Sequence, residues 1–311
     1  MDGALAFVFP GQGSQSVGML NELAAAYPEV KKTFKEASRP LGVDMWELVS
    51  QGPEQALNLT MNTQPALLSA GVAVWRVWCK HSSRRPALMA GHSLGEYTAL
   101  VCAEALDFGD ALKLVALRGK LMQEAAPEGQ GAMAALLGLE DGKVREICAQ
   151  AAEHETVSAA NFNSPGQVVI SGNAQAVERA IALAKQAGAR RAILLPVSVP
   201  SHCALMQPAA EKLAAALSAT PLQAPNIPVI HNANVAFHTD PDAIRDILAK
   251  QLYQPVRWTE TVLKMERAGI KTVLECGPGK VLCGLNKRIT PDITCLPLGE
   301  TGSLTQALEL T

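Results

Sequence analysis

The chain has 311 residues, of which 48% are hydrophobic and 18% are charged. A chain of this length can bury a large core in one large domain, or in one domain with a smaller companion. The formal net charge of −2 gives no global sign of nucleic-acid binding. The 7 cysteines form no C-x-x-C pair and do not sit with histidines at metal-ligand spacing, which predicts reduced thiols in a cytoplasmic protein and no metal site.

No targeting or membrane segment is expected. The N-terminus lacks the basic segment that opens a signal peptide. The longest apolar run covers residues 65–75, which is too short to cross a bilayer, and Arg76 follows it. We therefore expect a soluble protein that does not associate with a membrane.

The first predicted strand covers residues 4–9, a continuous apolar run typical of a strand buried on both faces of a parallel sheet. After it, Gly11 and Gly13 flank Gln12. These glycines let the backbone pass close to a ligand, so the N–H group of Gln12 is a candidate donor to an oxyanion. The alternative is a plain turn into a helix. Dinucleotide binding is set aside because Ser16 stands where G-x-G-x-x-G requires glycine or alanine.

Residues 18–82 predict several helices. The longest is expected to open at residues 62–65, with Thr63 as its N-cap and Pro65 in its first turn. A short apolar strand is then predicted at residues 86–90.

That strand runs into the sequence GHSLG at residues 91–95 and a helix that begins at Leu94. This is the G-x-S-x-G pattern of a nucleophile elbow, a sharp turn that glycine tolerates and that holds Ser93 clear of the sheet. The helix N-terminus directs free N–H groups and the positive end of its dipole to the same place, where an oxyanion would be stabilised. The alternative is a glycine-rich turn whose serine is only a helix cap.

Another helix is predicted over residues 108–124, with Arg118 inside an apolar stretch. Such an arginine either lies on the exposed face of the helix or is a partly buried charge that needs an anionic partner. The spacing alone favours the exposed face.

The segment that follows has a different order of predicted strands and helices. Strands are predicted at 131–139, 157–162, 167–171 and 190–195, helices at 140–153 and 173–187, and a hairpin turn at 163–166. This β-α-β-β-α-β order is the ferredoxin-like arrangement. We therefore expect a small ferredoxin-like domain, residues 128–197, inserted into a large α/β domain formed by residues 1–127 and 198–311.

The last third of the chain returns to the large domain. Helices are predicted at 204–217, 241–252 and 258–268, and strands at 228–230, 272–276 and 294–297. The final strand is expected to be followed by one more helix.

A serine nucleophile needs a base, and the chain has 6 histidines. His202 lies in a turn just beyond the small domain, where a loop could lean over the elbow, and it is the preferred base. The others are placed less well: His81, His92, His154, His231 and His238. No Asp or Glu is clearly placed between Ser93 and His202, so a backbone carbonyl could orient the imidazole in place of an acid.

Four segments occur together in this chain: residues 9–15 (FPGQGSQ), 91–97 (GHSLGEY), 117–119 (LRG) and 200–203 (PSHC). In this order and spacing they resemble the family of malonyl-CoA:acyl carrier protein transacylases, together with the acyltransferase domains of polyketide and fatty acid synthases. The resemblance extends over almost the whole chain. It implies an α/β-hydrolase-like large domain with a parallel sheet beside the ferredoxin-like one.

The resemblance also implies roles for the matching residues. Ser93 would be the acylated nucleophile, and His202 would act first as general base and then as general acid. Gln12 and Leu94 would supply the backbone N–H groups of an oxyanion hole.

Two further roles follow from the resemblance. Arg118 would bind the free carboxylate of a malonyl group, which reverses the exposed placement that its spacing favours. The main-chain carbonyl of Gln251 would orient His202.

The implied reaction transfers malonyl from malonyl-CoA, through malonyl-Ser93, to the phosphopantetheine thiol of acyl carrier protein and so supplies fatty acid biosynthesis. It needs no cofactor and no metal, and we expect a monomer that meets the carrier protein transiently. The alternatives are a trans-acting polyketide acyltransferase with the same chemistry and a serine thioesterase or esterase. Cations that could attract an acidic carrier protein are Lys185, Arg190, Arg191, Lys280, Lys287 and Arg288.

Overall fold

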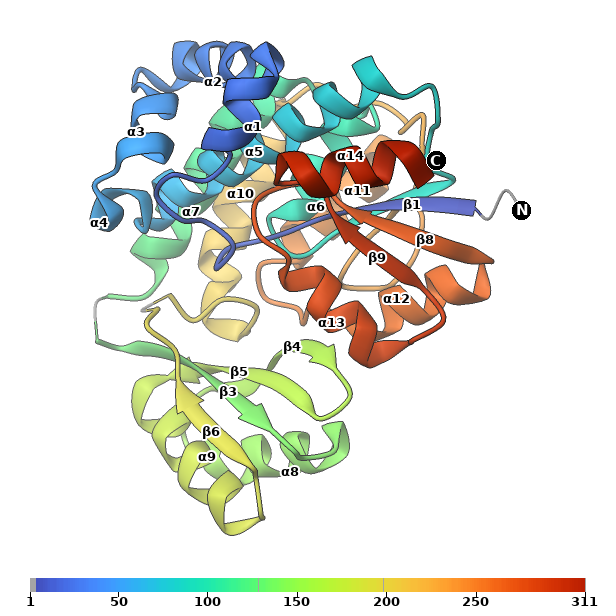
Figure 1. Ribbon diagram of the computed structural model, residues 1–311. Helices are drawn as coiled ribbons and strands as arrows, with labels where there is room; N and C mark the ends of the chain where they lie inside the picture. The colour runs from blue at the N-terminus through green and yellow to red at the C-terminus, as the bar shows by residue number, and fades with distance from the viewer. Residues whose placement is uncertain (1–3, 128, 198, 311) are drawn as a thin grey trace.

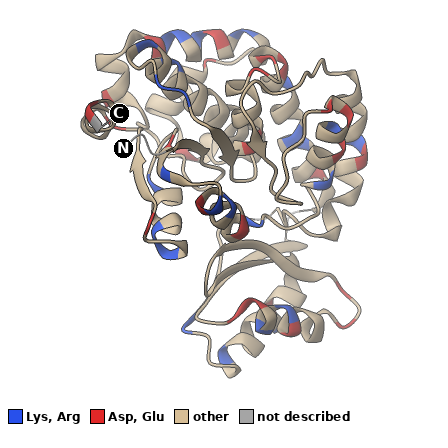
Figure 2. Ribbon diagram, turned by 90° about the vertical axis from the view of Figure 1, so that its right-hand side faces the viewer, with Lys and Arg blue, Asp and Glu red and all other residues tan. Residues whose placement is uncertain are grey.

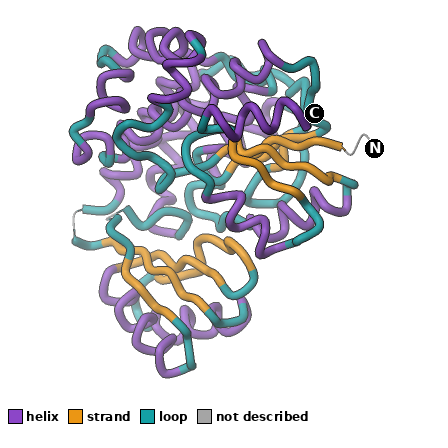
Figure 3. The backbone as a smooth tube through the Cα atoms, in the orientation of Figure 1, coloured by secondary structure: helices purple, strands orange, loops and turns teal. Residues whose placement is uncertain are grey.

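The computed structural model describes residues 4–127, 129–197 and 199–310 (Figure 1). In this part of the chain the strands form a five-stranded sheet and a separate four-stranded sheet. Figure 3 shows the smaller sheet, with two helices beneath it, as a lower lobe of the molecule. The chain is therefore a mixed α/β protein with a parallel and an antiparallel sheet, which confirms the predicted class at this level.

The larger sheet has the strand order β7-β2-β1-β8-β9, and all of its strand pairs are parallel. Its strands are β1 (Ala4–Phe9), β2 (Leu88–Gly91), β7 (Val229–Ile230), β8 (Ile270–Glu275) and β9 (Thr294–Pro297). Because β1 lies at the centre, the loops after β1 and β2 leave the same edge of the sheet side by side.

The two faces of this sheet pack into different cores. Phe7 and Phe9 of β1 belong to the larger core, while Ala6 and Val8 belong to a second core on the opposite face. This alternation follows from the two-residue repeat of a strand, and both faces are apolar because helices cover both.

Most helices belong to this part of the molecule. They are α1 (Asn21–Ala26), α2 (Pro28–Leu41), α3 (Met45–Gln51), α4 (Glu54–Leu57), α5 (Thr60–His81), α6 (Gly95–Cys102), α7 (Phe108–Ala125), η1 (Ala204–Met206), α10 (Gln207–Ala219), α11 (Pro241–Lys250), α12 (Trp258–Arg267), α13 (Val281–Ile289) and α14 (Thr301–Leu310). Side chains of α5, α6 and α7 fill the larger core, and side chains of α12 and α13 fill the second. None of the helices in the described ranges is both long and apolar enough to cross a membrane.

The smaller sheet is antiparallel, with strand order β4-β5-β3-β6. Its elements follow one another as β3 (Gly131–Leu137), α8 (Asp141–Ala152), β4 (Val157–Ser164), β5 (Gln167–Asn173), α9 (Ala174–Gln186) and β6 (Arg191–Leu194). One face packs on α8 and α9 around its own core. The other face carries Met133 and Val169 and turns toward the larger sheet, where both residues line a cleft.

The structure corrects three details of the sequence prediction. The helix expected to open at residues 62–65 begins at Thr60, because the Thr63 hydroxyl donates back to the Leu57 and Leu59 carbonyls and caps no N–H group. Asn163 belongs to strand β4, so the hairpin turn contains only residues 165 and 166.

The third correction is a missed helix. Residues 281–289 form α13, and its N-terminal N–H groups are held by the carboxylate of Glu275 at the end of β8. The two predicted domain boundaries, at residues 128 and 198, lie outside the described residues.

Candidate active site

Ser93 stands on a strained turn between β2 and α6, with a left-handed φ of 52°. Glycine is required on both sides of it. A Cβ on Gly91 would lie 1.8 Å from the carbonyl carbon of Gly95, and a Cβ on Gly95 would lie 2.0 Å from the Phe9 oxygen. The two glycines of the turn therefore pack directly against each other, and Gly95 also packs against the end of β1. This contact fixes the direction of the serine side chain.

The structure brings His202 against this serine. The Nε2 atom of His202 lies 2.8 Å from the Ser93 hydroxyl, and its Nδ1 atom lies 2.7 Å from the main-chain oxygen of Gln251. Because a carbonyl only accepts, Nδ1 carries the proton and Nε2 is free to accept from the hydroxyl. A backbone carbonyl thus takes the place of the acid in a catalytic triad, which was the arrangement left open by the sequence.

Burial and the nearby Arg118 charge lower the pKa of His202 to about 3. The imidazole is therefore neutral at physiological pH, as a proton acceptor must be.

Arg118 is buried, with 1% of its surface exposed, so the exposed position favoured by its spacing is wrong. Its guanidinium donates to the side-chain oxygens of Gln64 at 2.8 Å and Gln251 at 3.0 Å, and to the Ser93 hydroxyl at 3.2 Å. All three acceptors are uncharged, and Arg118 Nε has no hydrogen-bond partner among the described residues. Burial lowers the pKa of Arg118, so the site favours an added negative charge.

Two backbone N–H groups are free near the serine. Within the described ranges, the N–H groups of Gln12 and Leu94 have no hydrogen-bond partner, and both residues line the same cleft as Ser93. The Gln12 loop packs on the elbow so closely that a Cβ on Gly11 would lie 2.4 Å from the His92 oxygen. Two free donors beside a nucleophile suit a developing oxyanion.

Asn232 decides which N–H group of the elbow is free. Its side-chain oxygen accepts from the Ser93 N–H at 2.7 Å, and its amide nitrogen donates to the Gly91 oxygen at 2.7 Å. The Ser93 N–H is therefore occupied, which leaves that of Leu94. The sequence did not predict the contact of Asn232 with the Ser93 N–H group or the contact of Gln64 with Arg118, because neither residue belongs to a recognised motif.

The other histidines near the elbow have different partners. His92 Nε2 lies 2.8 Å from Asn163 of β4, so it joins the elbow to the smaller sheet and does not face the serine hydroxyl. His231 is buried against the Glu96 carboxylate at 2.6 Å. Neither histidine serves Ser93 as a base.

Ser93, His202 and Arg118 lie in a cleft of about 480 Å³ between the two sheets. It is lined by all of the predicted site residues except Gln251, namely Gln12, Ser93, Leu94, Arg118 and His202. Gln251 lies fully buried behind them and reaches the site through its hydrogen bonds. Val281, Leu282 and Leu285 of α13 form part of the wall.

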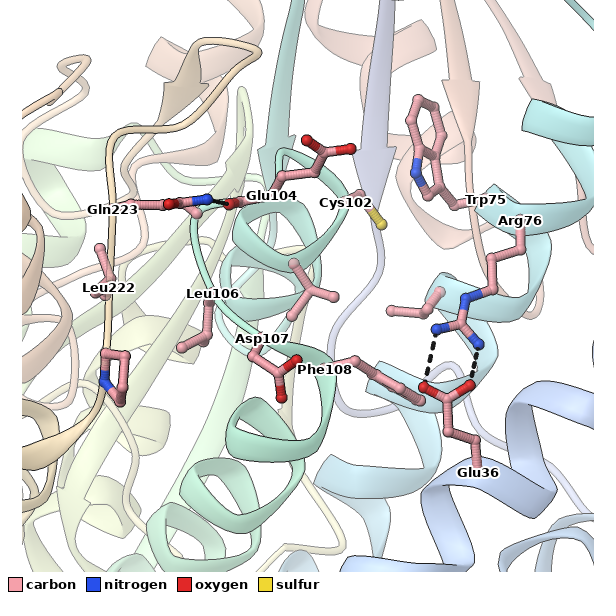
Figure 4. A pocket seen from close by; sticks show the side chains of 14 residues that line it. Glu36, Trp75, Arg76, Cys102, Glu104, Leu106, Asp107, Phe108, Leu222 and Gln223 are labelled. Atoms are coloured by element: carbon pink, nitrogen blue, oxygen red, sulfur yellow. Dashed lines mark hydrogen bonds and ion pairs between the residues drawn. The ribbon is translucent and has the colours of Figure 1, made fainter.

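A second cavity, of about 630 Å³, has no lining residue in common with the first (Figure 4). Its Arg76 guanidinium is already paired with the Glu36 carboxylate, at 2.7 and 3.1 Å, and stacks on Phe108. Burial raises the pKa of its Cys102 thiol well above the ordinary value, which keeps this thiol protonated. Among the described residues, this larger cavity therefore has no counterpart of the Ser93–His202 hydrogen bond of the smaller cleft.

The serine, the neutral histidine and the free N–H donors are the parts of a nucleophilic acyl-transfer site. Comparison with known proteins gives the family: residues 6–288 match the acyl transferase domain model. The chain belongs to this family. It is 58% identical over 305 residues to the malonyl CoA-acyl carrier protein transacylase of Escherichia coli strain K12, covering 98% of this chain and 99% of that protein.

Solved structures agree with this. An acyl carrier protein S-malonyltransferase from Vibrio cholerae has a TM-score of 0.96 and 57% identity, over 97% of this chain and 99% of that one. A type II polyketide synthase acyl-carrier protein has been solved in complex with its malonyl-transacylase, and the matching chain has a TM-score of 0.98 and 55% identity, over 99% of this chain and 100% of that one.

Proposed function

We propose that this chain transfers the malonyl group of malonyl-CoA to the phosphopantetheine thiol of acyl carrier protein, through a malonyl-Ser93 intermediate. The proposal accords with the names of its relatives. The observation that carries it is the buried guanidinium of Arg118, which contacts the Ser93 hydroxyl and has only uncharged partners among the described residues. A malonyl carboxylate supplies the missing negative charge and can take two parallel hydrogen bonds.

In the first half of the cycle, Ser93 attacks the thioester carbonyl of malonyl-CoA. His202 Nε2 takes the hydroxyl proton, and the Nδ1 bond to the Gln251 oxygen keeps the imidazole in the required tautomer. The N–H groups of Gln12 and Leu94 stabilise the oxyanion. The C–S bond then breaks, the CoA sulfur takes the proton from His202, and the serine ester remains.

In the second half, the carrier protein thiol occupies the place that CoA has left. His202 removes the thiol proton, the sulfur attacks the serine ester, and the C–O bond breaks. The proton returns to the Ser93 oxygen, and malonyl-carrier protein departs. No proton or electron is gained over the complete cycle, and each proton passes between Ser93, His202 and the two thiols, so we propose a cycle that uses neither a metal nor a cofactor.

Selection among acyl groups follows from the same arginine. An acetyl group would enclose the Arg118 guanidinium without a counter-charge, and leaving that buried charge unpaired costs on the order of a few kcal/mol. The carboxylated acyl group is therefore favoured over the neutral one.

A serine thioesterase or esterase would share the elbow and dyad but would use water as the acceptor. The charged guanidinium where a neutral acyl chain would lie argues against that function. A trans-acting polyketide acyltransferase would use the same residues and differ only in its carrier protein.

We also infer the finer architecture and setting. The strand order β4-β5-β3-β6 and the alternation of helices support a ferredoxin-like small domain, and its separate core supports a boundary near residues 128 and 198. The parallel sheet and the elbow between β2 and α6 support an α/β-hydrolase-like large domain formed by the rest of the chain. The cytoplasmic location and the monomeric state stay predictions from the sequence.

A transfer assay tests the function. Malonyl-CoA is mixed with the protein, with and without holo acyl carrier protein, and both malonyl-carrier protein and free malonate are measured. We expect malonyl-carrier protein to form and little malonate to be released. Rapid release of malonate with no transfer to the carrier protein would instead identify a thioesterase.

A further inference from the structure

The buried carboxylate of Glu96 lies behind the site and touches none of the reacting atoms. Glu96 belongs to the first turn of α6, three residues after the nucleophile, and has no exposed surface. It accepts hydrogen bonds from the Asn232 N–H at 2.9 Å and from the Gln251 side-chain nitrogen at 2.8 Å, and it contacts His231 Nδ1 at 2.6 Å. Its partners are 135, 136 and 155 residues away in the sequence.

Two of these partners hold the reacting groups. The Asn232 side chain bonds the Ser93 N–H and the Gly91 oxygen, so it fixes the turn that carries the nucleophile. The Gln251 main-chain oxygen orients His202, and its side-chain oxygen accepts from Arg118. One carboxylate is therefore connected, through two residues, to the nucleophile, the base and the guanidinium.

The Gln251 side-chain amide could be placed with its oxygen and nitrogen exchanged, so its neighbours must fix which end faces Arg118. Its nitrogen faces Glu96 and the Ser93 oxygen, and its oxygen faces Arg118. If the amide were reversed, its nitrogen would face the donors of Arg118, and its oxygen would face the negative carboxylate. The Glu96 carboxylate and the Ser93 main-chain oxygen therefore both hold the amide in the direction that presents its oxygen to Arg118.

We propose that Glu96 is a positioning residue, which aligns Ser93, His202 and Arg118 through Asn232 and Gln251. Its carboxylate makes no hydrogen bond to the Arg118 guanidinium, which donates to Gln64, Ser93 and Gln251. The two η nitrogens of Arg118 are therefore bonded only to uncharged acceptors that an incoming carboxylate can replace. This inference rests on the proposed malonyl transfer for its substrate readout.

The test is Glu96→Gln, which keeps the side-chain size but replaces one acceptor oxygen by a donor. The Asn232 N–H group and the Gln251 amide both donate to Glu96 Oε2, while His231 Nδ1 faces Oε1. In the variant these two donors keep at most one uncharged acceptor oxygen, and hydrogen bonds to an uncharged oxygen are about half as strong as those to a carboxylate, so their positions are held less firmly. We expect kcat for malonyl transfer to fall about 10-fold to 100-fold. We also expect the preference for malonyl-CoA over acetyl-CoA, measured as the ratio of kcat/KM values, to fall about tenfold, because Arg118 loses its fixed direction.

Glu275→Gln is the matched control. Glu275 is equally buried, and its carboxylate holds the backbone N–H groups of Leu282 and Cys283 without bonding to the elbow. This variant reports the general effect of losing a buried carboxylate. Because Glu275 holds the N-terminus of α13 beside the cleft, we expect kcat to fall less than in Glu96→Gln and the acyl preference to stay unchanged. If Glu96→Gln keeps both kcat and acyl preference as Glu275→Gln does, the positioning role is wrong.

A second variant and a second measurement complete the test. If Glu96→Gln does not fold, Glu96→Asp replaces it with the same readouts, because its carboxylate ends one methylene short of Asn232 and Gln251. The rate at which a fluorophosphonate modifies Ser93 is measured in each protein and needs no malonyl group. If the wild type does not transfer malonyl, the proposed function fails, while a modification rate for Glu96→Gln equal to that of Glu275→Gln would overturn the role of Glu96 independently.

Discussion

We propose that Arg118 selects the acyl group, because its buried guanidinium touches the Ser93 hydroxyl and has only uncharged partners among the described residues. Removing it removes both the carboxylate ligand and the penalty against neutral acyl groups.

The first prediction is that Arg118→Ala lowers kcat/KM for malonyl-CoA about 100-fold or more and raises the relative rate with acetyl-CoA. Steady-state transfer with both thioesters measures this. Arg118→Lys is a useful control, since it keeps the charge without the two-pronged geometry and should stay well below the wild type. A variant Arg118→Ala that still strongly prefers malonyl-CoA would contradict the carboxylate contact.

The second prediction concerns His202 and pH. Its pKa is lowered from 6.5 to about 3 in the folded protein, so below pH 6.5 the unfolded chain binds a proton that the folded protein does not. Protein stability therefore falls as the pH falls through this range. The effect should be about 2 kcal/mol between about pH 7 and about pH 5.

Urea unfolding of the wild type and of His202→Asn at the two pH values measures this effect. The variant has no imidazole at this position, so it should lose about 2 kcal/mol less on acidification. Equal losses would mean that His202 has an ordinary pKa.

Among single residues, the sequence identified side chains that the structure brings together in the cleft, but not the partners that surround them. The residues Ser93, His202 and Arg118 stand in recognisable motifs, but their partners do not. Arg118 looks exposed from its helix spacing, and its acceptors Gln64 and Gln251 lie 54 and 133 residues away. Such contacts are created by the fold and leave no local pattern to read.

The elbow between β2 and α6 is the element on which the site is built. Its two glycines leave no space for a Cβ, whereas Gly284 in α13 has no heavy atom within 4 Å of the position of a Cβ and is exposed. Glycine is therefore needed at the elbow for contact reasons and is only a poor helix former in α13.

The third prediction compares the two places by chemical denaturation. Gly95→Ala should lower the free energy of unfolding by about 3 kcal/mol or more, because the added methyl group meets the Phe9 backbone. Gly284→Ala should raise it by about 0.5–1 kcal/mol. A Gly95→Ala protein as stable as the wild type would show that the elbow can relax, against the geometry described above.

Elements were predictable where the pattern is local. Strand β1 and helix α7 follow from an apolar run and from helical spacing, and both lie within a residue of their expected ends. Helix α13 was missed because it is short, contains a glycine, and has its N-terminus held by Glu275 from a neighbouring strand. Strand β4 extends beyond its prediction to Ser164, and its Asn163 bonds to His92 across the cleft.

At the scale of the whole molecule, strands of the smaller sheet form one wall of the cleft, and loops and helices around the larger sheet form the other. The two walls are joined. The β4 backbone bonds to Val256 in both directions, and His92 reaches Asn163. In Figure 2 the ribbon colours of cationic and anionic residues are distributed over both lobes, so the net charge of −2 describes no single face. Docking of an acidic carrier protein must then depend on local cations.

The structure distinguishes the two groups of candidate cations. Lys287 and Arg288 are exposed on α13, whose other face lines the cleft. Arg190 and Arg191 are exposed at the start of β6, a strand of the smaller sheet in the lower lobe of Figure 1, and do not line the cleft.

The fourth prediction is that Lys287→Glu with Arg288→Glu raises KM for the carrier protein about tenfold and leaves KM for malonyl-CoA less affected. The same reversal at Arg190 and Arg191 should have a smaller effect. Lys32→Glu with Lys35→Glu on α2, in the upper lobe of Figure 1, controls for net charge. Equal KM values in all three double variants would exclude α13 as the docking element.

Mass spectrometry of the intact protein tests the central claim most directly. After mixing with malonyl-CoA, the wild type should gain the mass of one malonyl group, and holo carrier protein should then remove it. Ser93→Ala should gain nothing under the same conditions. A malonyl adduct that persists in Ser93→Ala, or transfer to the carrier protein with no adduct on the wild type, would contradict an acyl-enzyme formed on this serine.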